Sequence, residues 1–228
     1  MAPDSLAQLY AEVVACRRCP RLVEWREAAA AAPPRRFAGQ RYWARPLPGF
    51  GDERARVLVV GLAPAAHGGN RTGRLFTGDR SGDFLFASLH RTGFANQASS
   101  IAVDDGLALH GLYVAAAVRC APPDNKPTPS ELAGCLPYLV REMAILAELR
   151  VVVALGAFAW YAVIRSLGMV SHDNSPKRVF GHLAEASVGP HALLGSYHPS
   201  QQNTFTGRLT PTMLDAVMVR ARELAGLD

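Results

Sequence analysis

Four short apolar runs, separated by helical patterns, constrain the fold of this chain more than any other feature. They cover residues 57–62, 112–118, 151–155 and 192–197. Continuous apolar runs of this length are typical of strands in a parallel sheet, because both faces of such a sheet are buried. The alternation of strand and helix predicts an α/β fold, a three-layer α/β/α sandwich around a mainly parallel four-stranded sheet.

Start signals mark several of the helices. The segment 128–131 (TPSE) predicts a capping box with proline at the first helical position, and a second helix is expected from Ser81 to Gly93. Further helices are expected over residues 5–16, 156–167 and 211–227. Residues 28–34 (AAAAAPP) are expected to form a frayed helix end that runs into a loop.

Length and hydropathy limit the domain organisation. A chain of 228 residues with 49% hydrophobic residues is long enough for one well-buried domain and too short for two, so we expect a single domain over residues 1–228. No apolar run approaches the roughly 20 residues that span a bilayer. The N-terminus has the pattern of an amphipathic helix and not of a secretion signal. We therefore expect a cytoplasmic protein with no membrane partner.

The charge is basic, with a formal net value of +5 that comes almost entirely from arginine. The only lysines are Lys126 and Lys177. A basic chain suits a polyanionic partner, because neutralising phosphates releases condensed counterions. An arginine-rich and alanine-rich composition can also reflect a biased genome, so charge alone favours nucleic acid only weakly.

The four cysteines form a C-x2-C pair, Cys16 and Cys19, and a distant C-x14-C pair, Cys120 and Cys135. Without a secretion signal, this pattern indicates a four-thiolate metal site and not disulfides. Ordinary core packing would explain the distant pair, but not the pair in the arginine-rich segment CRRCPR. Zinc and a [4Fe–4S] cluster both accept four thiolates, and the spacing does not separate them. No thiol is left over for ligand exchange, so a structural role is expected.

Three polar, Gly- and Pro-rich segments follow three of the expected strands. They are GLAPAAHGGNRTGRLFTGD after the first strand, RCAPPDNKPTP after the second and HPSQQNTFTGRLT after the fourth. In open α/β sheets, ligands bind at the carboxyl ends of the strands. We therefore expect these three loops to meet at one crevice.

These segments, together with VVVALG and Cys135, resemble the family-5 branch of the uracil-DNA glycosylase superfamily, in the right order from Cys16 to Leu209. The resemblance implies an α/β/α fold, a [4Fe–4S] cluster on the four cysteines, and DNA repair by hydrolysis of the N-glycosidic bond of a flipped-out base. The implied partners are double-stranded and single-stranded DNA containing uracil or other damaged bases. A groove gripping duplex DNA is compatible with a monomer.

The resemblance also assigns roles to individual residues. Phe76 is expected to stack on the extruded base, Asp79 to lie near the attacking water, and His198 to lie beside the base carbonyl. From the residues alone, Phe76 equally suits a core aromatic and His198 a core or capping histidine. Asp79 precedes an expected helix, where aspartate is usually a cap.

Other expected pocket residues are Asn125 and the backbone around Leu62 and Ala63, although Asn125 also suits a simple turn. Stricter relatives carry an acid in the first loop, where this chain has residues 61–64 (GLAP), and an asparagine where Ala116 aligns. A site lacking that amide rejects wrong bases less strongly. The resemblance therefore predicts relaxed specificity for uracil and other deaminated or modified bases.

Basic residues in the same loops are candidates for phosphate contacts: Arg71, Arg74, Lys126 and Arg208. Each of them could instead be an ordinary solvated charge on the surface. The stretch 201–205, with Gln202 and Phe205, is expected to supply a wedge into the duplex. Strand cleavage by a glycosylase needs an amine nucleophile, and lysine is scarce, so a monofunctional enzyme is expected.

Two other functions fit parts of the sequence. A non-catalytic, metal-stabilised nucleic-acid-binding module would explain why the first loop lacks an acid. An iron–sulfur redox protein would explain the cysteines, but not the polar loops after the first and fourth strands.

Overall fold

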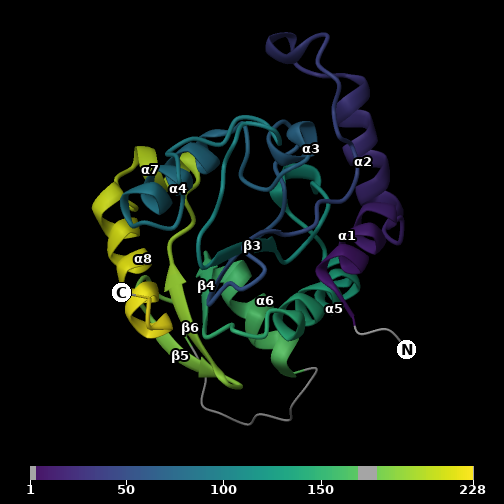
Figure 1. Ribbon diagram of the computed structural model, residues 1–228. Helices are drawn as coiled ribbons and strands as arrows, with labels where there is room; N and C mark the ends of the chain where they lie inside the picture. Colours follow the sequence, from purple (N-terminus) through teal and green to yellow (C-terminus); the bar gives the residue numbers. More distant parts are fainter. Residues whose placement is uncertain (1–3, 169–178, 228) are drawn as a thin grey trace.

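The computed structural model describes residues 4–168 and 179–227. In this part of the chain a six-stranded sheet has the order β1-β3-β2-β4-β6-β5 (Figure 1). Its four central strands are parallel: β3 (Leu112–Ala116), β2 (Val57–Gly61), β4 (Val151–Leu155) and β6 (His191–Ser196). They are the four apolar runs of the sequence, so the predicted α/β class is confirmed.

The expectation of four strands was too low, because the sheet has an antiparallel strand at each edge. β1 (Phe50–Gly51) pairs with β3, and β5 (Glu185–Val188) pairs with β6. β1 is two residues long, and in β5 only Val188 is buried. Neither strand therefore has an apolar run that sequence patterning detects.

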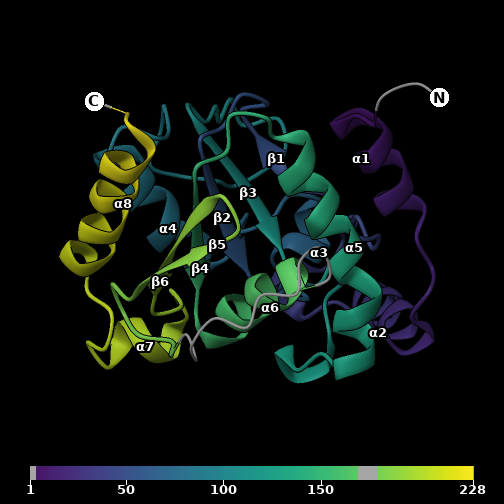
Figure 2. The ribbon, with the colours of Figure 1, turned by 90° about the horizontal axis from the view of Figure 1, so that it is seen from below.

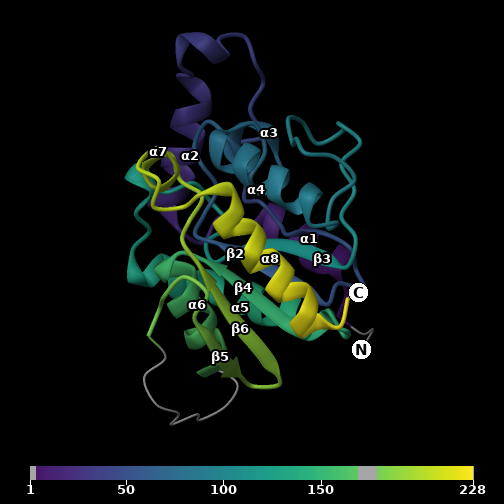
Figure 3. The same ribbon diagram turned by 90° about the vertical axis from the view of Figure 1, so that its left-hand side faces the viewer.

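Alternate residues of the central strands supply two cores, one on each face of the sheet. Val57 and Val59 pack with α4 (Arg80–Arg91) and α8 (Pro211–Ala225). Leu58 and Val60 pack on the opposite face with α5 (Pro129–Ile145) and α6 (Ala157–Gly168). Figures 2 and 3 show these helix pairs on either side of the sheet, which gives the expected three layers.

Helix termini follow the start signals in the sequence. Thr128 and Glu131 form the predicted capping box at the start of α5. α4 begins at Arg80, one residue earlier than expected, with Asp79 as its N-cap. Thr210 caps α8, and Gly226 ends it in the left-handed region at φ 63°.

Two N-terminal helices lie beside α5, away from α4 and α8 (Figure 2). α1 (Leu6–Ala15) is capped by Ser5, and α2 (Pro20–Ala31) ends within the alanine run and is followed by a loop, as expected. Short helices complete the loops: η1 (Arg35–Phe37), α3 (Gly69–Thr72), η2 (Pro123–Asn125) and α7 (Gln201–Phe205). Among the described residues, no helix combines the length and the hydropathy needed to cross a bilayer.

Candidate active site and cysteine site

The loops after β2, β3 and β6 meet around one cavity of about 450 Å³. Its walls come from residues 62–65, residues 75–81 and residues 198–202, with Asn125 from the loop after β3. The expected convergence of three loops is therefore found. Seven of the residues singled out from the sequence line this cavity: Leu62, Ala63, Phe76, Asp79, Asn125, His198 and Gln202.

Two neighbouring rings line this cavity, those of Phe76 and His198. Their centroids are 6.2 Å apart and their planes are inclined by 34°. Phe76 has a φ of 52°, a left-handed conformation that is uncommon for a bulky residue. Its ring lies over Gly61, where an added Cβ would come within 2.6 Å of the ring. The position of the Phe76 ring therefore depends on a glycine at the end of β2.

His198 follows the end of β6 and is held by the surrounding backbone. Its carbonyl accepts a hydrogen bond from Asn203 Nδ2 at 2.8 Å, and its Cβ packs against Gly156, which has a φ of 91°. Burial lowers the pKa of His198 to about 4. The imidazole is therefore neutral at pH 7, with one nitrogen able to donate a hydrogen bond and the other able to accept one.

Asp79 both caps a helix and lines the cavity. Its carboxylate accepts a hydrogen bond from the Gly82 N–H at 3.0 Å, as an N-cap does. The other carboxylate oxygen lies against Gly68, where any side chain would collide with it. Burial raises the pKa of Asp79, and the N–H groups of Gly82 and Ser81 oppose that shift.

The backbone after β2 offers hydrogen-bond donors to the cavity. In the described structure, the N–H groups of Ala63 and Ala65 form no hydrogen bond, and both residues line the cavity. Ala116, in contrast, is 1% exposed and packs with the core on the α4 and α8 side. Ala116, predicted as a pocket residue from its alignment with the asparagine of stricter relatives, therefore lies in this core and not in the cavity wall.

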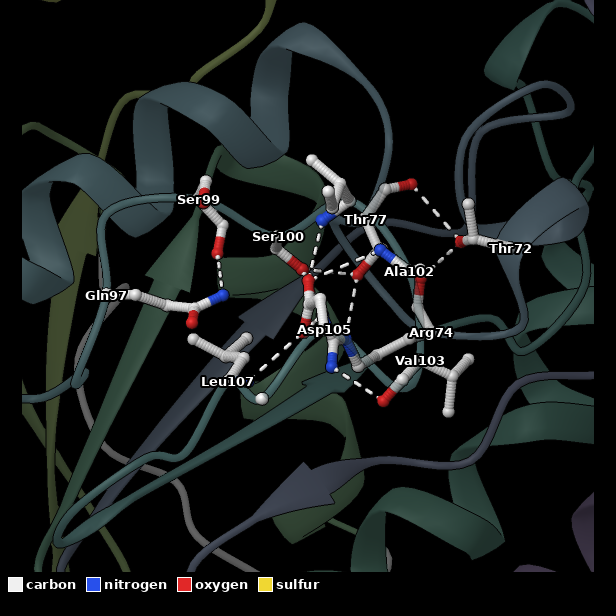
Figure 4. Close-up of polar contacts among 12 residues, drawn as sticks. Thr72, Arg74, Thr77, Gln97, Ser99, Ser100, Ala102, Val103, Asp105 and Leu107 are labelled. Carbon is white, nitrogen blue, oxygen red and sulfur yellow. Dashed lines mark hydrogen bonds and ion pairs between the residues drawn. The ribbon is translucent and has the colours of Figure 1, made fainter.

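The prediction that Arg74 contacts phosphate is wrong, because its guanidinium is buried and already paired. Its guanidinium forms an ion pair with Asp105 at 2.7 Å, and the side chains are only 8% and 5% exposed. Arg74 also donates to Thr77 Oγ1 at 3.0 Å and to Ser100 Oγ at 2.8 Å (Figure 4). This network holds the loop that carries Phe76.

Arg71 has a similar structural role. It donates through Nε to the His67 carbonyl, through one terminal nitrogen to Gln40, and through the other to the Gly78 carbonyl, all within 2.9 Å. The remaining candidates for DNA contact are exposed: Lys126, Gln202, Phe205 and Arg208. Phe205 is 67% exposed and lies on α7, whose first residues, Gln201 and Gln202, line the cavity. Lys177 lies outside the described residues.

Several cavity residues were not anticipated from the sequence, among them Leu75, Arg80, Ser81 and Ser200. A second cavity of about 640 Å³ adjoins the first and shares Asp79, Arg80 and Asn125 with it. Its outer wall includes Trp25 on α2 and Arg36 and Phe37 in η1. The basic and aromatic composition of residues 35–45 (RRFAGQRYWAR) is the signal that could have found this wall.

The four cysteines line one small cavity between α1, α2 and α5, and none forms a disulfide. The buried guanidinium of Arg26 donates to Cys120 Sγ at 2.9 Å, while its Nε lacks a partner. A buried cation needs an anion nearby, and thiolates would supply one. Burial raises the pKa of the Cys120 thiol to about 12, so a metal must displace its proton to bind.

Within the described residues, no three His, Cys, Asp or Glu side chains are arranged as ligands of one metal ion. The cysteines thus surround a shared cavity without converging on a single ion. The donor set, four thiols beside a buried cation, fits an anionic iron–sulfur cluster.

Comparison with known proteins places this arrangement in a family. The sequence model of the uracil DNA glycosylase superfamily matches residues 48–221, so the chain belongs to that superfamily. It is 52% identical over 226 residues to a type-5 uracil-DNA glycosylase of Mycobacterium tuberculosis, covering 98% of this chain and 83% of the relative. It is 51% identical over 216 residues to the type-5 enzyme of Thermus thermophilus, covering 94% and 96%.

A type-4 uracil-DNA glycosylase of Pyrobaculum aerophilum is more distant, with 29% identity over 164 residues, 70% of this chain and 74% of the relative. The chain is therefore a member of the type-5 branch of the superfamily.

Proposed function

We propose that this chain is a DNA-repair enzyme that hydrolyses the N-glycosidic bond of uracil flipped out of DNA. The observation that carries the proposal is the cavity at the carboxyl edge of the sheet, where Phe76, Asp79 and His198 lie together in a member of this superfamily. A cavity of about 450 Å³ has room for a single base and its sugar.

The aromatic wall of the cavity recognises the base. Extruding a nucleotide costs a few kcal/mol, and stacking on an aromatic ring recovers about 1–3 kcal/mol per base. Phe76 provides that ring, and Asn125 and Gln202 provide polar groups at the rim of the same cavity.

Stabilisation of the leaving base comes from His198 and the first loop. As the glycosidic bond breaks, negative charge develops on the carbonyl oxygens of uracil. Neutral His198 donates to one of these oxygens, and the N–H of Ala63 supplies a second donor. Donors aimed at a developing charge lower the barrier more than they strengthen ground-state binding.

Asp79 acts on the sugar side. As a carboxylate it orients the attacking water and offsets the positive charge of the oxocarbenium-like sugar. One of its oxygens is held by the Gly82 N–H at 3.0 Å, which fixes the carboxylate without neutralising it. The helix cap and the catalytic group are therefore the same side chain.

We propose relaxed specificity because the interior of the cavity offers the base an aromatic ring, backbone N–H groups and one histidine, while the side-chain amides of Asn125 and Gln202 lie at the rim. Such groups suit several deaminated or modified bases. Since Ala116 lies in the core, replacing it by asparagine has to repack the sheet before it can alter base selection.

The proposed cofactor is a [4Fe–4S] cluster held by Cys16, Cys19, Cys120 and Cys135. A cluster with one thiolate per iron would cross-link α1 and α2 to α5 and give Arg26 its anionic partner. Its role is structural, and the hydrolysis uses only the residues of the cavity. We also infer a monomer in the cytoplasm that acts on both single-stranded and duplex DNA.

The test is incubation with end-labelled single-stranded and duplex DNA carrying one uracil, followed by alkali, which cleaves at an abasic site. We expect alkali-dependent cleavage at the uracil position, and slower cleavage at other deaminated bases. Binding without cleavage would favour a non-catalytic module, and neither binding nor cleavage would favour a redox protein.

A further inference from the structure

Residues 35–45 form a basic and aromatic segment, here named the arginine strap, which the proposed function does not use. The strap carries Arg35, Arg36, Arg41 and Arg45, and it contains no acidic residue. All four arginines are exposed. None of them forms an ion pair in the described structure, whereas ion pairs engage arginines across the rest of the molecule: Arg17, Arg21, Arg54, Arg56, Arg74, Arg91, Arg119, Arg141 and Arg220.

The strap is held in place by the loop that follows β2. Tyr42 Oη lies 3.0 Å from His67 Nδ1, and the N–H of Trp43 donates to the Arg71 carbonyl at 3.0 Å. The guanidinium of Arg45 lies 5.8 Å above the Trp43 ring. Stacked in this way, an arginine is pre-ordered while its N–H groups stay available to a phosphate.

A continuous surface connects the strap to the catalytic cavity. The 640 Å³ cavity shares Asp79 and Arg80 with the catalytic cavity and is also lined by Trp25 and Phe37. Arg71 packs 4.3 Å from the Phe37 ring centroid and also lines a third cavity, of about 380 Å³, with Arg41 and Arg45.

The two outer cavities differ in charge, which indicates what each one binds. The cavity beside Trp25 also contains Asp83 and Asp124, so it suits a base better than a phosphate. Trp25 is 39% exposed and offers a ring for stacking. The cavity of the strap has the exposed Arg41 and Arg45 in its wall and no carboxylate, and Arg71, whose nitrogens already donate within the loop, adds a further positive charge, so this cavity suits a phosphate.

We propose that the arginine strap and Trp25 form a second DNA subsite, which binds the single-stranded flank of the strand whose damaged base occupies the catalytic cavity. A neighbouring base stacks on Trp25, and the following phosphates contact Arg41 and Arg45. This subsite rests on the proposed function, because it extends the same strand from the same cavity.

The test compares the double variant Arg41→Gln/Arg45→Gln with a control, Arg54→Gln/Arg165→Gln, that removes the same charge from exposed positions remote from the cavity. Binding is measured by anisotropy on a long labelled single strand containing 2′-fluorodeoxyuridine, over a range of salt concentrations. The slope of log K against log salt should fall in magnitude by about 1.4 in the strap variant and stay constant in the control, since each phosphate contact contributes about 0.7.

Trp25→Ala should weaken the same complex about tenfold with no change in salt slope, because stacking releases no counterions. Excision of uracil from a short oligonucleotide that lacks every nucleotide of this flank should be equal in the wild type, the Arg41→Gln/Arg45→Gln variant, Trp25→Ala and the control. An unchanged salt slope in the strap variant, or an equal loss in the control, would overturn the subsite. Failure of the wild type to excise uracil from any substrate would instead overturn the proposed function.

Discussion

Replacing Asp105 by alanine should destabilise the protein strongly, although Asp105 lies outside the cavity. The carboxylate pairs with the buried Arg74 and also accepts the N–H groups of Ile101 at 2.7 Å and Leu107 at 3.1 Å. Removing one partner of a buried ion pair costs about 3–5 kcal/mol, because the remaining charge is uncompensated. For a domain of this size each kcal/mol lowers the melting temperature by about 2–4 °C, so we expect a loss of about 6–20 °C.

The assay is thermal unfolding of the holoprotein at pH 7 and one scan rate, followed by circular dichroism. Glu185→Ala is the matched control, because its pair with Arg220 is 44% and 40% exposed and contributes within about 1 kcal/mol. Single-turnover excision should also fall in Asp105→Ala, since Gly78, next to the cavity, donates to the carbonyl of Ser100 in the same network. A melting temperature no lower than that of Glu185→Ala would refute this reasoning.

The ion pair between Arg74 and Asp105 should also make the stability of the protein depend on pH in the acid range. Burial opposes ionisation of Asp105, but hydrogen bonds from Arg74 and backbone N–H groups lower its pKa to about 2. Because the unfolded carboxyl has a pKa near 3.9, this contribution to stability is complete above about pH 4 and is lost as the pH falls towards 2. Asp105→Asn should lack this component of the acid dependence.

Four further outcomes are expected. Asp79→Asn should slow single-turnover excision by roughly 10² while the melting temperature stays constant, because asparagine caps a helix equally well; an unchanged rate would leave Asp79 as a cap only. Stability should fall between pH 6.5 and 4, where unfolded His198 takes up a proton and folded His198 does not, and His198→Gln should flatten that part of the profile. The anaerobically purified protein should be brown and contain iron, and Cys120→Ser should lower its stability; a colourless protein with stoichiometric zinc would contradict the cluster. Borohydride should trap no covalent adduct with DNA, because Lys126 and Lys177 are the only lysines, and a trapped adduct would show lyase chemistry.

The sequence predicts those parts of the fold that depend on local residue patterns. The central strands are apolar because both faces are buried, and Thr128 with Glu131 indicates a helix start through local hydrogen bonds. The edge strand 185–188 (EASV) has a single buried residue, so its pairing with β6 depends on a partner that local sequence does not show.

The same distinction separates the predicted site residues that line the cavity from those that do not. Asp79 and His198 sit directly at element ends, where the topology of a parallel sheet places them at one edge. Arg74 lies in an equally polar loop, but its partner Asp105 is 31 residues away and only the folded chain brings the two together. Ala116 aligned with a pocket position, yet the alternation of side chains along β3 directs it into the core with Val114.

The strand order bears on when the enzyme first becomes active during its synthesis. One wall of the cavity follows β2, which ends at Gly61, and the histidine that follows β6 is His198, 137 residues later in the chain. At about 5–20 residues per second, a ribosome needs several seconds to make that interval. The parallel pairing of β2 with β4, which joins Val57 to Val151, is also intrinsically slow, because the long intervening segment must close first. A nascent chain that ends before β6 contains Asp79, Phe76 and the Ala63 N–H but lacks His198, so on the proposed mechanism we expect excision to begin only after β6 and the loop that follows it have been made and folded.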